Sequence, residues 1–382
     1  MAALKPSRTR NTSAVYFSPP AADNGRGPYR ALEALFRKVV SKKTITKGDD
    51  VAIKLHFGEA GNVRYIRPTI IRRLAELVKQ AGGIPFATDT LTLYKHQRHT
   101  LFAHLRTAAE HGFTPETLGC PVLIADGLRS TGVEVEVPHP LELDTCIVAQ
   151  AIYDADVLVN VAHLTLHPAF PIGAALKNIG MGCVTREMKL RSHSGTVHPI
   201  FDPSKCVLCG NCLRMCPGNA FTLKARKVHF DESLCVSCAD CFSFCEGGAL
   251  DVPWGEESQI VQRRTCDAAR GVLSTFAPEK VVHFVIAMDI TPGCDCFGVS
   301  DLPIVPDLGI FASTDPVAVD TAALDAMQAA PGYPGSKVDG TKGAEPGGDK
   351  IAEIWPALDL EAYRGILKES GLGKLEYKLR KL

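Results

Sequence analysis

The chain has 382 residues, of which 46% are hydrophobic, and this is enough for one large core or for two to three domains. Its 42 Lys and Arg residues balance 42 Asp and Glu residues, so the formal net charge at pH 7 is zero. A neutral chain without a basic run has no field that recruits nucleic acid or anionic lipid. We therefore expect a globular protein that binds neither nucleic acid nor a membrane.

The start of the chain carries no targeting signal. Met1–Ser13 is polar, and no apolar segment of signal-peptide type follows it. The longest apolar run, Val281–Met288, ends at Asp289 and is much shorter than a membrane span. These features predict a soluble, cytoplasmic protein, in which 14 cysteines are more typical of metal binding or redox chemistry than of disulfides.

Strands and helices alternate in the first part of the chain. Short apolar runs with strand character are separated by two segments of helical periodicity. The strands are expected at Ala14–Phe17, Val51–Phe57 and Ile84–Thr88, and the helices at Tyr29–Val40 and Arg67–Ala81. This β-α-β-α-β order is typical of a layered α/β domain with much parallel sheet.

Polar residues follow two of these strands. Lys54 and His56 end the strand that begins at Val51, and Asp89 ends the next one. In open α/β sheets, ligand-binding groups gather beyond the carboxyl ends of the strands. These residues are therefore candidates for a site, although a polar residue at a strand end can also simply cap the following helix.

The middle of the chain continues the pattern less regularly. A helix is expected at Leu101–His111, strands at Val122–Ala125, Val133–Val137 and Val157–Val161, and Ile147–Tyr153 fits either state. His163 and His167 follow the last strand, but Pro168 favours a loop, so ordinary hydrogen bonding is favoured there over a metal site. A helix beginning at Gly173–Lys177 ends in the glycine-rich turn Asn178–Cys183, which lacks a full nucleotide-binding fingerprint.

A duplicated cysteine motif lies between Phe201 and Val252. The spacing C-x2-C-x2-C-x3-C occurs twice, first at Cys206, Cys209, Cys212 and Cys216, then at Cys235, Cys238, Cys241 and Cys245. In two-cluster ferredoxins the fourth cysteine of each run ligates the other cluster. The motif therefore predicts two [4Fe-4S] clusters, the first held by Cys206, Cys209, Cys212 and Cys245, the second by Cys235, Cys238, Cys241 and Cys216.

Two other kinds of site also use closely spaced cysteines. Zinc sites also contain paired Cys-x2-Cys motifs, but a four-ligand zinc site has no use for a third cysteine at the same interval in both runs. A disulfide framework is typical of small secreted domains, and this chain has no secretory signal. Iron–sulfur clusters are therefore the favoured interpretation.

After Val252 the α/β pattern resumes. Helices are expected at Gln259–Leu273, from the N-cap Asp315 to Gln328, and at Leu360–Glu369. Strands are expected at Lys280–Ile290 and Gly309–Ala312, and a long loop at Ala330–Lys350. The simplest architecture is one α/β domain, residues 1–199 and 254–382, interrupted by a small α+β ferredoxin-like module at residues 200–253. Three sequential domains are the alternative, but the last would have only two strands for its core.

Two further cysteines, Cys294 and Cys296, lie one residue apart in a Pro-Gly turn. Two soft ligands at this spacing can hold a thiophilic metal in a second site or form a redox pair; otherwise they are two small, partly buried residues. Three others are expected to be core residues: Cys120, Cys146 and Cys266. Cys183, beside the glycine-rich turn, fits neither group clearly.

Seven blocks outside the cysteine motif stand out together: Lys54–Glu59, Thr88–Thr90, Leu93-Tyr94, Ala125–Gly127, Ala175–Gly182, Cys294–Cys296 and Ser313–Asp320. With the cluster cysteines, they resemble the DUF362 family of iron–sulfur proteins, in the branch whose α/β domain carries an inserted two-cluster ferredoxin segment. The resemblance implies an α/β domain without a settled activity, more distantly similar to the amino-terminal region of lactate-racemase-type proteins. Where family members often have Lys-Gly-His-Glu, this chain has Thr165–Pro168, which lacks the lysine and the carboxylate.

Three functions fit these observations. In the first, the two clusters transfer single electrons to or from a redox partner protein or the α/β domain. In the second, they feed an oxidoreductase site built from Lys54, His56, Asp89, Lys177, Asn178, Cys294, Cys296 and Asp315. The third is a cluster-dependent sensor or scaffold.

Five Lys/Arg and six Asp/Glu residues between Asp202 and Asp251 leave the module nearly neutral, which favours a part of a larger machine over an independent carrier steered by charge.

Overall fold

In the computed structural model, the described residues are 12–20, 27–194, 198–252 and 255–382. Most of the polar start, Met1–Ser13, therefore lies outside the described residues, as does part of the predicted module boundary, residues 253 and 254. Among the described helices, none combines the length and the apolar character that crossing a bilayer requires.

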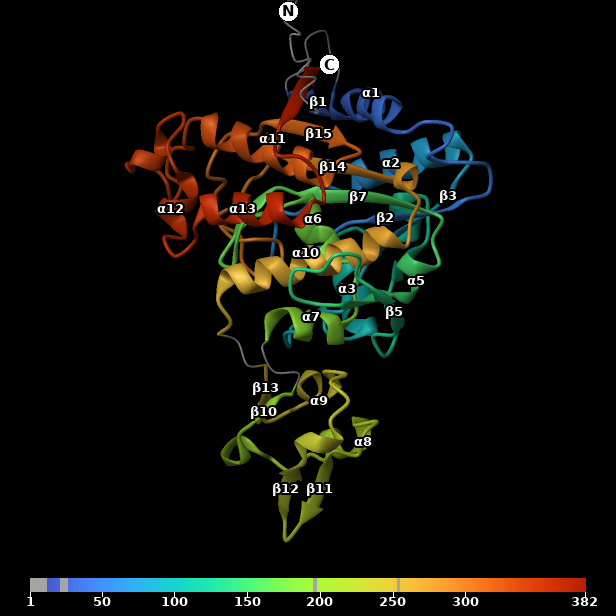
Figure 1. Cartoon of the computed structure of the whole chain (residues 1–382), viewed down its shortest axis with the longest axis vertical. Coiled ribbons are helices and arrows are strands. Elements are labelled where there is room, and N and C mark those ends of the chain that lie inside the picture. Colours follow the sequence, from blue (N-terminus) through green and yellow to red (C-terminus); the bar gives the residue numbers. More distant parts are fainter. Residues whose placement is uncertain (1–11, 21–26, 195–197, 253–254) are drawn as a thin grey trace, which may run out of the picture.

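An eight-stranded sheet forms the centre of the larger domain (Figure 1). Its order is β16 (Tyr377–Lys381), β1 (Ser13–Ser18), β15 (Gly309–Ser313), β14 (Val281–Ala287), β7 (Val157–His163), β2 (Asp50–Lys54), β3 (Ile84–Asp89) and β4 (Val122–Ile124). From β14 to β4 all neighbours are parallel, whereas β15 runs antiparallel to both β14 and β1. The predicted α/β class with a mostly parallel sheet is confirmed.

Both faces of the sheet are buried, because alternate side chains enter two different hydrophobic cores. In β7, Val157, Val159 and Val161 belong to the first core. Leu158 and Ala162, on the opposite face, belong to the second. Strands buried on both faces appear in a sequence as continuous apolar runs, and this is why β7 and β14 were found from the sequence.

Helices cover each face (Figure 1). Those with residues in the first core are α1 (Pro28–Val39), α2 (Pro68–Ala81), α3 (Leu101–Glu110) and α4 (Pro115–Leu118). Those with residues in the second core are α5 (Gln150–Tyr153), α6 (Ala175–Gly180), α7 (Arg186–His193), α10 (Ser258–Ser274), α11 (Pro316–Ala329), α12 (Lys350–Ile354) and α13 (Leu360–Ser370).

Short elements account for most of the differences from the prediction. The segment Ile147–Tyr153, which fitted either a strand or a helix, contains the end of a strand and then a helix. Strand β6 (Thr145–Ala149) pairs with β5 (Gly132–Glu136) and leads directly into α5. The loop expected at Pro168 is the turn of a small hairpin, β8 (Thr165–His167) and β9 (Phe170–Gly173). Helices α7 and α12 and strand β16 were not predicted, because they have too few residues to establish a clear periodicity.

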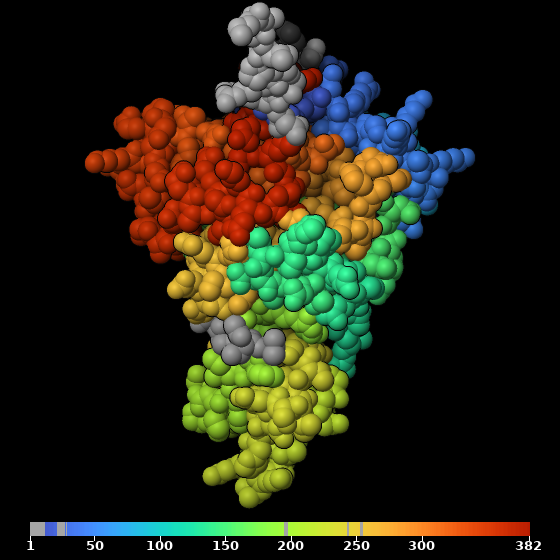
Figure 2. Space-filling model, viewed as in Figure 1, coloured from blue at the N-terminus to red at the C-terminus, as the bar shows by residue number. Residues whose placement is uncertain are grey.

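The cysteine segment forms a smaller lobe at the opposite end of the molecule from β1 and β16 (Figures 1 and 2). It contains two antiparallel pairs, β10 (Ile200–Phe201) with β13 (Leu250–Asp251) and β11 (Phe221–Lys224) with β12 (Lys227–Phe230), and the helices α8 (Asn211–Met215) and α9 (Asp240–Ser243). The lobe lies between β7 and β14 in the chain, yet these two strands are neighbours in the large sheet. The chain therefore leaves the larger domain and returns to it.

A buried ion pair joins this lobe to the larger domain. Arg186 of α7 is buried, and its Nη1 lies 2.6 Å from Oδ1 of Asp240 in α9. The same guanidinium donates hydrogen bonds to the carbonyl oxygens of Thr92 and His99. Leu93, in the loop after β3, packs into the hydrophobic cluster of the lobe. Helix α7 and the loop that follows β3 together form the surface on which the lobe docks.

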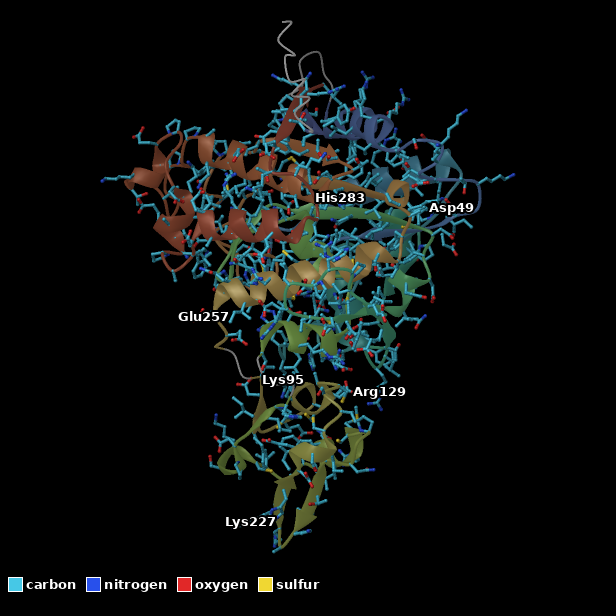
Figure 3. All side chains as sticks on the ribbon, in the orientation of Figure 1. Asp49, Lys95, Arg129, Lys227, Glu257 and His283 are labelled. Carbon is cyan, nitrogen blue, oxygen red and sulfur yellow. A yellow bond between two sulfur atoms is a disulfide. The ribbon has the colours of Figure 1, made fainter. Side chains whose placement is uncertain are left out.

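Lys95 and Arg129 also lie at this junction (Figure 3). Nζ of Lys95 donates a hydrogen bond of 2.6 Å to the carbonyl oxygen of Cys245, and Nη1 of Arg129 lies 3.3 Å from Sδ of Met215. Contacts from the larger domain therefore reach both cysteine repeats.

Gly180 allows α6 to approach α10 closely, because a Cβ at this position would lie 2.3 Å from the carbonyl oxygen of Thr265. We expect Gly180→Ala to lower the free energy of unfolding by about 1–3 kcal/mol, measured by urea denaturation. Gly365→Ala is the matched control, since its Cβ would meet nothing within 4 Å. That variant should gain roughly 1 kcal/mol from helix propensity. Equal stability of the two variants would contradict the close approach.

Arg186→Met removes the guanidinium and leaves the Asp240 carboxylate without its partner. Losing one partner of a buried pair costs about 3–5 kcal/mol, and we expect a fall of this size in the free energy of unfolding in urea. The control is Arg72→Met, because Arg72 forms an exposed pair with Glu76 and should change stability by less than about 1 kcal/mol. If the free energy of unfolding fell by the same small amount in both variants, the pair between Arg186 and Asp240 would not stabilise the junction as expected.

Candidate functional site

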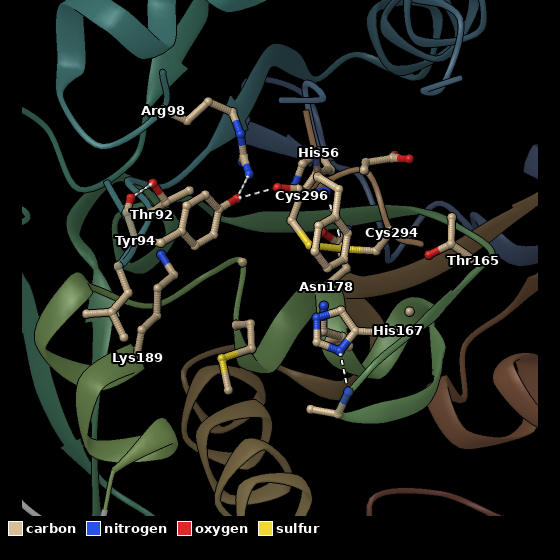
Figure 4. A pocket seen from close by; sticks show the side chains of 18 of the residues that line it. His56, Thr92, Tyr94, Arg98, Thr165, His167, Asn178, Lys189, Cys294 and Cys296 are labelled. Carbon is tan, nitrogen blue, oxygen red and sulfur yellow. Dashed lines mark hydrogen bonds between the residues drawn. A yellow bond between two sulfur atoms is a disulfide. The ribbon is translucent and has the colours of Figure 1, made fainter. Parts of the chain in front are cut away.

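A cavity of about 650 Å³ lies at the carboxyl ends of β2, β3 and β7 (Figure 4). Because these strands are parallel neighbours, their last residues, Lys54, Asp89 and His163, lie along one edge of the sheet. Seven of the eight residues proposed from the sequence line this cavity: Lys54, His56, Asp89, Lys177, Asn178, Cys294 and Cys296.

Asp315 is the exception, since it is not among the residues that line the cavity. Its carboxylate accepts a hydrogen bond of 2.9 Å from the backbone N–H of Ala318 and one of 2.6 Å from Oγ of Ser13. The predicted N-cap role is therefore confirmed, whereas the placement of Asp315 in the site was wrong. A strand-end position does not distinguish a helix cap from a ligand-binding residue.

Lys54 and Asp89 bind each other. The Nζ of Lys54 is fully buried and lies 3.0 Å from Oδ1 of Asp89, and it also donates to Oδ1 of Asn178 and to the carbonyl oxygen of Leu55, each at 2.7 Å. Burial by itself would raise the pKa of Asp89, but the Lys54 ammonium holds that pKa well below its usual value. The ammonium has three acceptors, so Lys54 stabilises the sheet edge and leaves no hydrogen for a ligand.

Arg98 and Tyr94 were not predicted as site residues. Arg98 is buried, and its guanidinium lies 3.2 Å from Asp89 and 3.2 Å from Glu59. It also donates a hydrogen bond to the Tyr94 hydroxyl, which in turn donates to the carbonyl oxygen of Cys296 at 3.1 Å (Figure 4). Both residues belong to an irregular loop after β3, where no periodicity marks a buried side chain.

His56 and His167 present the same tautomer. The Nδ1 of His56 accepts the backbone N–H of Gly58 at 2.9 Å, and the Nδ1 of His167 accepts that of Ala169 at 3.0 Å. Burial lowers the pKa of both rings well below the ordinary value, with Arg98 adding to the effect at His56 and Lys177 at His167. Each ring is therefore neutral, and these hydrogen bonds assign its proton to Nε2.

His163 is held between two acceptors. Its Nδ1 lies 2.8 Å from Oδ1 of Asp295, and its Nε2 lies 2.7 Å from the carbonyl oxygen of Met288. Burial would lower the pKa of His163, but Asp295 and these hydrogen bonds raise it above the ordinary value. A ring with acceptors on both sides is best satisfied as the imidazolium. Ordinary hydrogen bonding, rather than metal binding with His167, was the favoured prediction for His163, and it is confirmed.

Lys177 differs from Lys54 because its ammonium has no hydrogen-bond partner within the described part of the chain. It lies 5.6 Å from the centroid of the Phe170 ring and lines the cavity. Burial lowers its pKa from 10.5 to about 8, while the Asp295 carboxylate acts in the opposite direction. This ammonium is available to a group that enters the cavity.

Cys294 and Cys296 form a disulfide in the cavity wall (Figure 4). A ring nitrogen of His167 and the two sulfur atoms lie within 4.8 Å of one another, a grouping that could hold a metal ion. However, both sulfurs are bonded to each other, and Nδ1 of His167 already accepts the N–H of Ala169. In this oxidised form the site is a disulfide beside a neutral imidazole.

The first set of predicted cluster cysteines lies around one small cavity. Cys206, Cys209, Cys212 and Cys245 all line it, with apolar residues of the lobe around them. Burial raises the pKa of the Cys212 thiol, and the neighbouring thiols of Cys209, Cys206 and Cys245 raise it further. Three of these cysteines come from the first repeat and one from the second.

The second set is grouped in the complementary way. Burial raises the pKa of Cys235, Cys238 and Cys241, and the thiol of Cys216 acts on all three in the same direction. Cys216 belongs to the first repeat and the other three to the second. The eight thiols therefore lie in two groups of four, each drawn from both repeats.

The remaining cysteines are structural. The three expected in the core are buried and free: Cys120, Cys146 and Cys266. Cys183 is also buried and free, and burial raises its pKa to about 12, so it remains a thiol. It does not line the large cavity.

Two known proteins resemble parts of the chain. The thylakoid-associated protein sll1697 of Synechocystis sp. (strain ATCC 27184 / PCC 6803 / Kazusa) is 29% identical over 155 residues, which are 39% of this chain and 43% of that protein. The structure of the lactate racemase apoprotein from Thermoanaerobacterium thermosaccharolyticum aligns with a TM-score of 0.37 and 10% identity, over 72% of this chain and 51% of that one. The chain thus covers about half, or less, of each relative.

A family model, the domain of unknown function DUF362, matches residues 51–325. This range contains the sheet edge, the large cavity and the whole cysteine segment. Because the match extends over more than half of the chain, the chain belongs to the DUF362 family.

Proposed function

We propose that this protein transfers electrons through two [4Fe-4S] clusters. The observation that carries the proposal is the grouping of eight thiols into two sets of four, each with three cysteines from one repeat and one from the other. Such an exchange of the fourth ligand is typical of two-cluster ferredoxins. Neither a zinc site nor a disulfide framework requires two groups of four cysteines that exchange their fourth member.

The backbone of both repeats fits this cofactor. Leu208 and Ser237 occupy equivalent positions and have φ values of 56° and 59°, and Gly210 and Ala239 follow with 72° and 64°. Left-handed conformations cost energy in residues other than glycine, so their repetition points to a shared role. Successive N–H groups in such turns form a concave surface that stabilises negative charge.

Hydrogen bonds to the thiols support the same proposal. The backbone N–H of Ser237 bonds to Cys235, that of Asp240 bonds to Cys238, and each bond favours the thiolate. The N–H of Ala220 donates to Sγ of Cys216 at 3.3 Å. When bound, the clusters supply one-electron chemistry, and hydrogen bonds to their sulfur ligands raise their reduction potentials. The chain holds the ligands, shields them with apolar side chains and donates these bonds.

A redox partner can approach both groups of cysteines. Val207 and Leu208, within the first motif, are 62% and 44% exposed, and Leu234 and Val236, beside and within the second, are 47% and 51% exposed. Small apolar surfaces of this kind suit the weak, transient contacts of electron-transfer partners. We therefore propose that a protein donor or acceptor docks on the lobe.

A second candidate function is an oxidoreductase with a substrate site on the α/β domain. It is favoured by the large cavity, whose wall contains the unpaired Lys177 ammonium and the Cys294–Cys296 disulfide. The Oδ2 of Asp295, in the same wall, has no hydrogen-bond partner within the described residues. A buried polar atom without a partner is unusual in a site that stays empty.

Anaerobic purification and cluster reconstitution should give about eight irons and eight sulfides per chain, with an EPR signal from interacting clusters after reduction. The physical reason is that eight thiolates in two groups complete two four-iron sites. Cys120→Ser, which changes a free buried thiol outside the lobe, is the control and should keep the full iron content. Tightly bound zinc with little sulfide would disprove the proposal.

Two double variants distinguish the exchanged ligand assignment from a sequential one. If the fourth ligands are exchanged, Cys206→Ser with Cys245→Ser damages only the first cluster and leaves about four irons. Cys206→Ser with Cys216→Ser then damages both clusters. A sequential assignment predicts the opposite order of iron contents, so the same two measurements decide between them.

A further inference from the structure

The Cys294–Cys296 disulfide is a group in the wall of the large cavity that can be oxidised and reduced. Cys294 is buried, Cys296 is partly exposed, and both sulfurs belong to the cavity wall. A disulfide at such a wall can be reached by protons and by small molecules, unlike a disulfide that is enclosed in a core. Its surroundings therefore decide what chemistry it can support.

These surroundings would stabilise the reduced sulfurs. The backbone N–H of Cys296 lies 3.2 Å from Sγ of Cys294 and donates to it. A nitrogen of the neutral His167 ring lies within 4.8 Å of the sulfurs, and the ammonium of Lys177 lines the same cavity. Hydrogen-bond donors and a cation favour thiolates, and the Lys177 ammonium can also release a proton to them.

The loop after β3 connects this disulfide with the first group of cluster cysteines. The hydroxyl of Tyr94 donates to the carbonyl oxygen of Cys296 at 3.1 Å. The next residue, Lys95, donates through Nζ to the carbonyl oxygen of Cys245 at 2.6 Å. Arg98 holds the Tyr94 hydroxyl in place from the other side. Two adjacent residues thus touch the cavity disulfide and the lobe.

We propose that Cys294 and Cys296 form a two-electron centre that is reduced through the clusters of the lobe. This inference rests on the proposed function, because it needs both clusters. A low-potential one-electron donor reduces the clusters, and two electrons then break the S–S bond. With two protons, taken up through the cavity, the products are two thiols. The clusters, held by the eight lobe cysteines, would supply the single electrons, and the two thiols of the α/β domain would store the electron pair.

Two arguments favour this redox role over a metal site at the same residues. The tautomer of His167 places its proton on Nε2, and its Nδ1 already accepts the N–H of Ala169, so neither nitrogen has a free lone pair. The reduction potentials of [4Fe-4S] clusters also extend below those of protein disulfides, so a low-potential cluster can reduce a disulfide. A metal ion would require the histidine to break its bond and the disulfide to be reduced first.

The test uses the full chain with both clusters and dithionite supplying about two electrons per chain, the number that one disulfide accepts. In the wild type we expect most of the EPR signal of reduced clusters to be lost as the electrons move on. Trapping with N-ethylmaleimide in denaturant should then label both cysteines of the peptide that contains Cys294 and Cys296. This labelling requires no variant.

Three variants serve as controls. Cys294→Ala with Cys296→Ala should keep all its iron and retain the EPR signal, because the clusters have no internal acceptor. Cys120→Ala, which removes an unrelated free thiol, should behave as the wild type. Cys206→Ser with Cys245→Ser, which lacks the first cluster, should leave the peptide unlabelled.

The outcomes separate this inference from the proposed function. If the wild type contains iron and sulfide but keeps both electrons on its clusters, with the peptide unlabelled, the inference is wrong and the proposed function stands. Equal labelling in the variant that lacks the first cluster would show direct reduction by dithionite and would also overturn it. Absence of iron and sulfide from the wild type would overturn both.

Discussion

The fully buried ammonium of Lys54 holds the functional edge of the sheet together. Its ion pair with Asp89 joins β2 to β3, and its hydrogen bond to Asn178 joins both strands to α6. Asn178 continues the network by donating to Oδ1 of Asn160 in β7. A buried charge is tolerated only when it is fully paired, so this network constrains the positions of three strands and a helix.

The glycine-rich turn after α6 makes room for this ammonium. A Cβ at Gly182 would lie 2.4 Å from Nζ of Lys54, and one at Gly180 would collide with Thr265 of α10. Gly182 therefore serves close packing around a buried lysine and Gly180 close packing against α10, so a packing role accounts for both glycines. With Lys54 and Asp89 neutralising each other, Lys177 and the neutral histidines are left to define the chemistry of the cavity.

The loop after β3 performs two tasks at once. Through Leu93, Lys95 and the carbonyl oxygen of Thr92 it docks the cysteine lobe, and through Tyr94 and Arg98 it forms a wall of the cavity. Arg186 and Asp240 then keep the lobe in place with a buried pair. The cysteine lobe and a cavity with a disulfide consequently share one short segment, and this proximity underlies the proposed transfer between them.

The sequence by itself determined the α/β class, the long elements and the residue types at the strand ends, because apolar periodicity and cysteine spacing are local signals. It located Lys54, Asp89 and Cys294 at the site, yet it could not show that the lysine and the aspartate pair with each other. Site roles for Arg98 and Tyr94 were not predicted because these roles depend on Glu59, Asp89 and Cys296, which lie elsewhere in the chain. Only the tertiary structure decided which charges are neutralised and which donors remain free, since desolvation and pairing depend on partners that folding brings together.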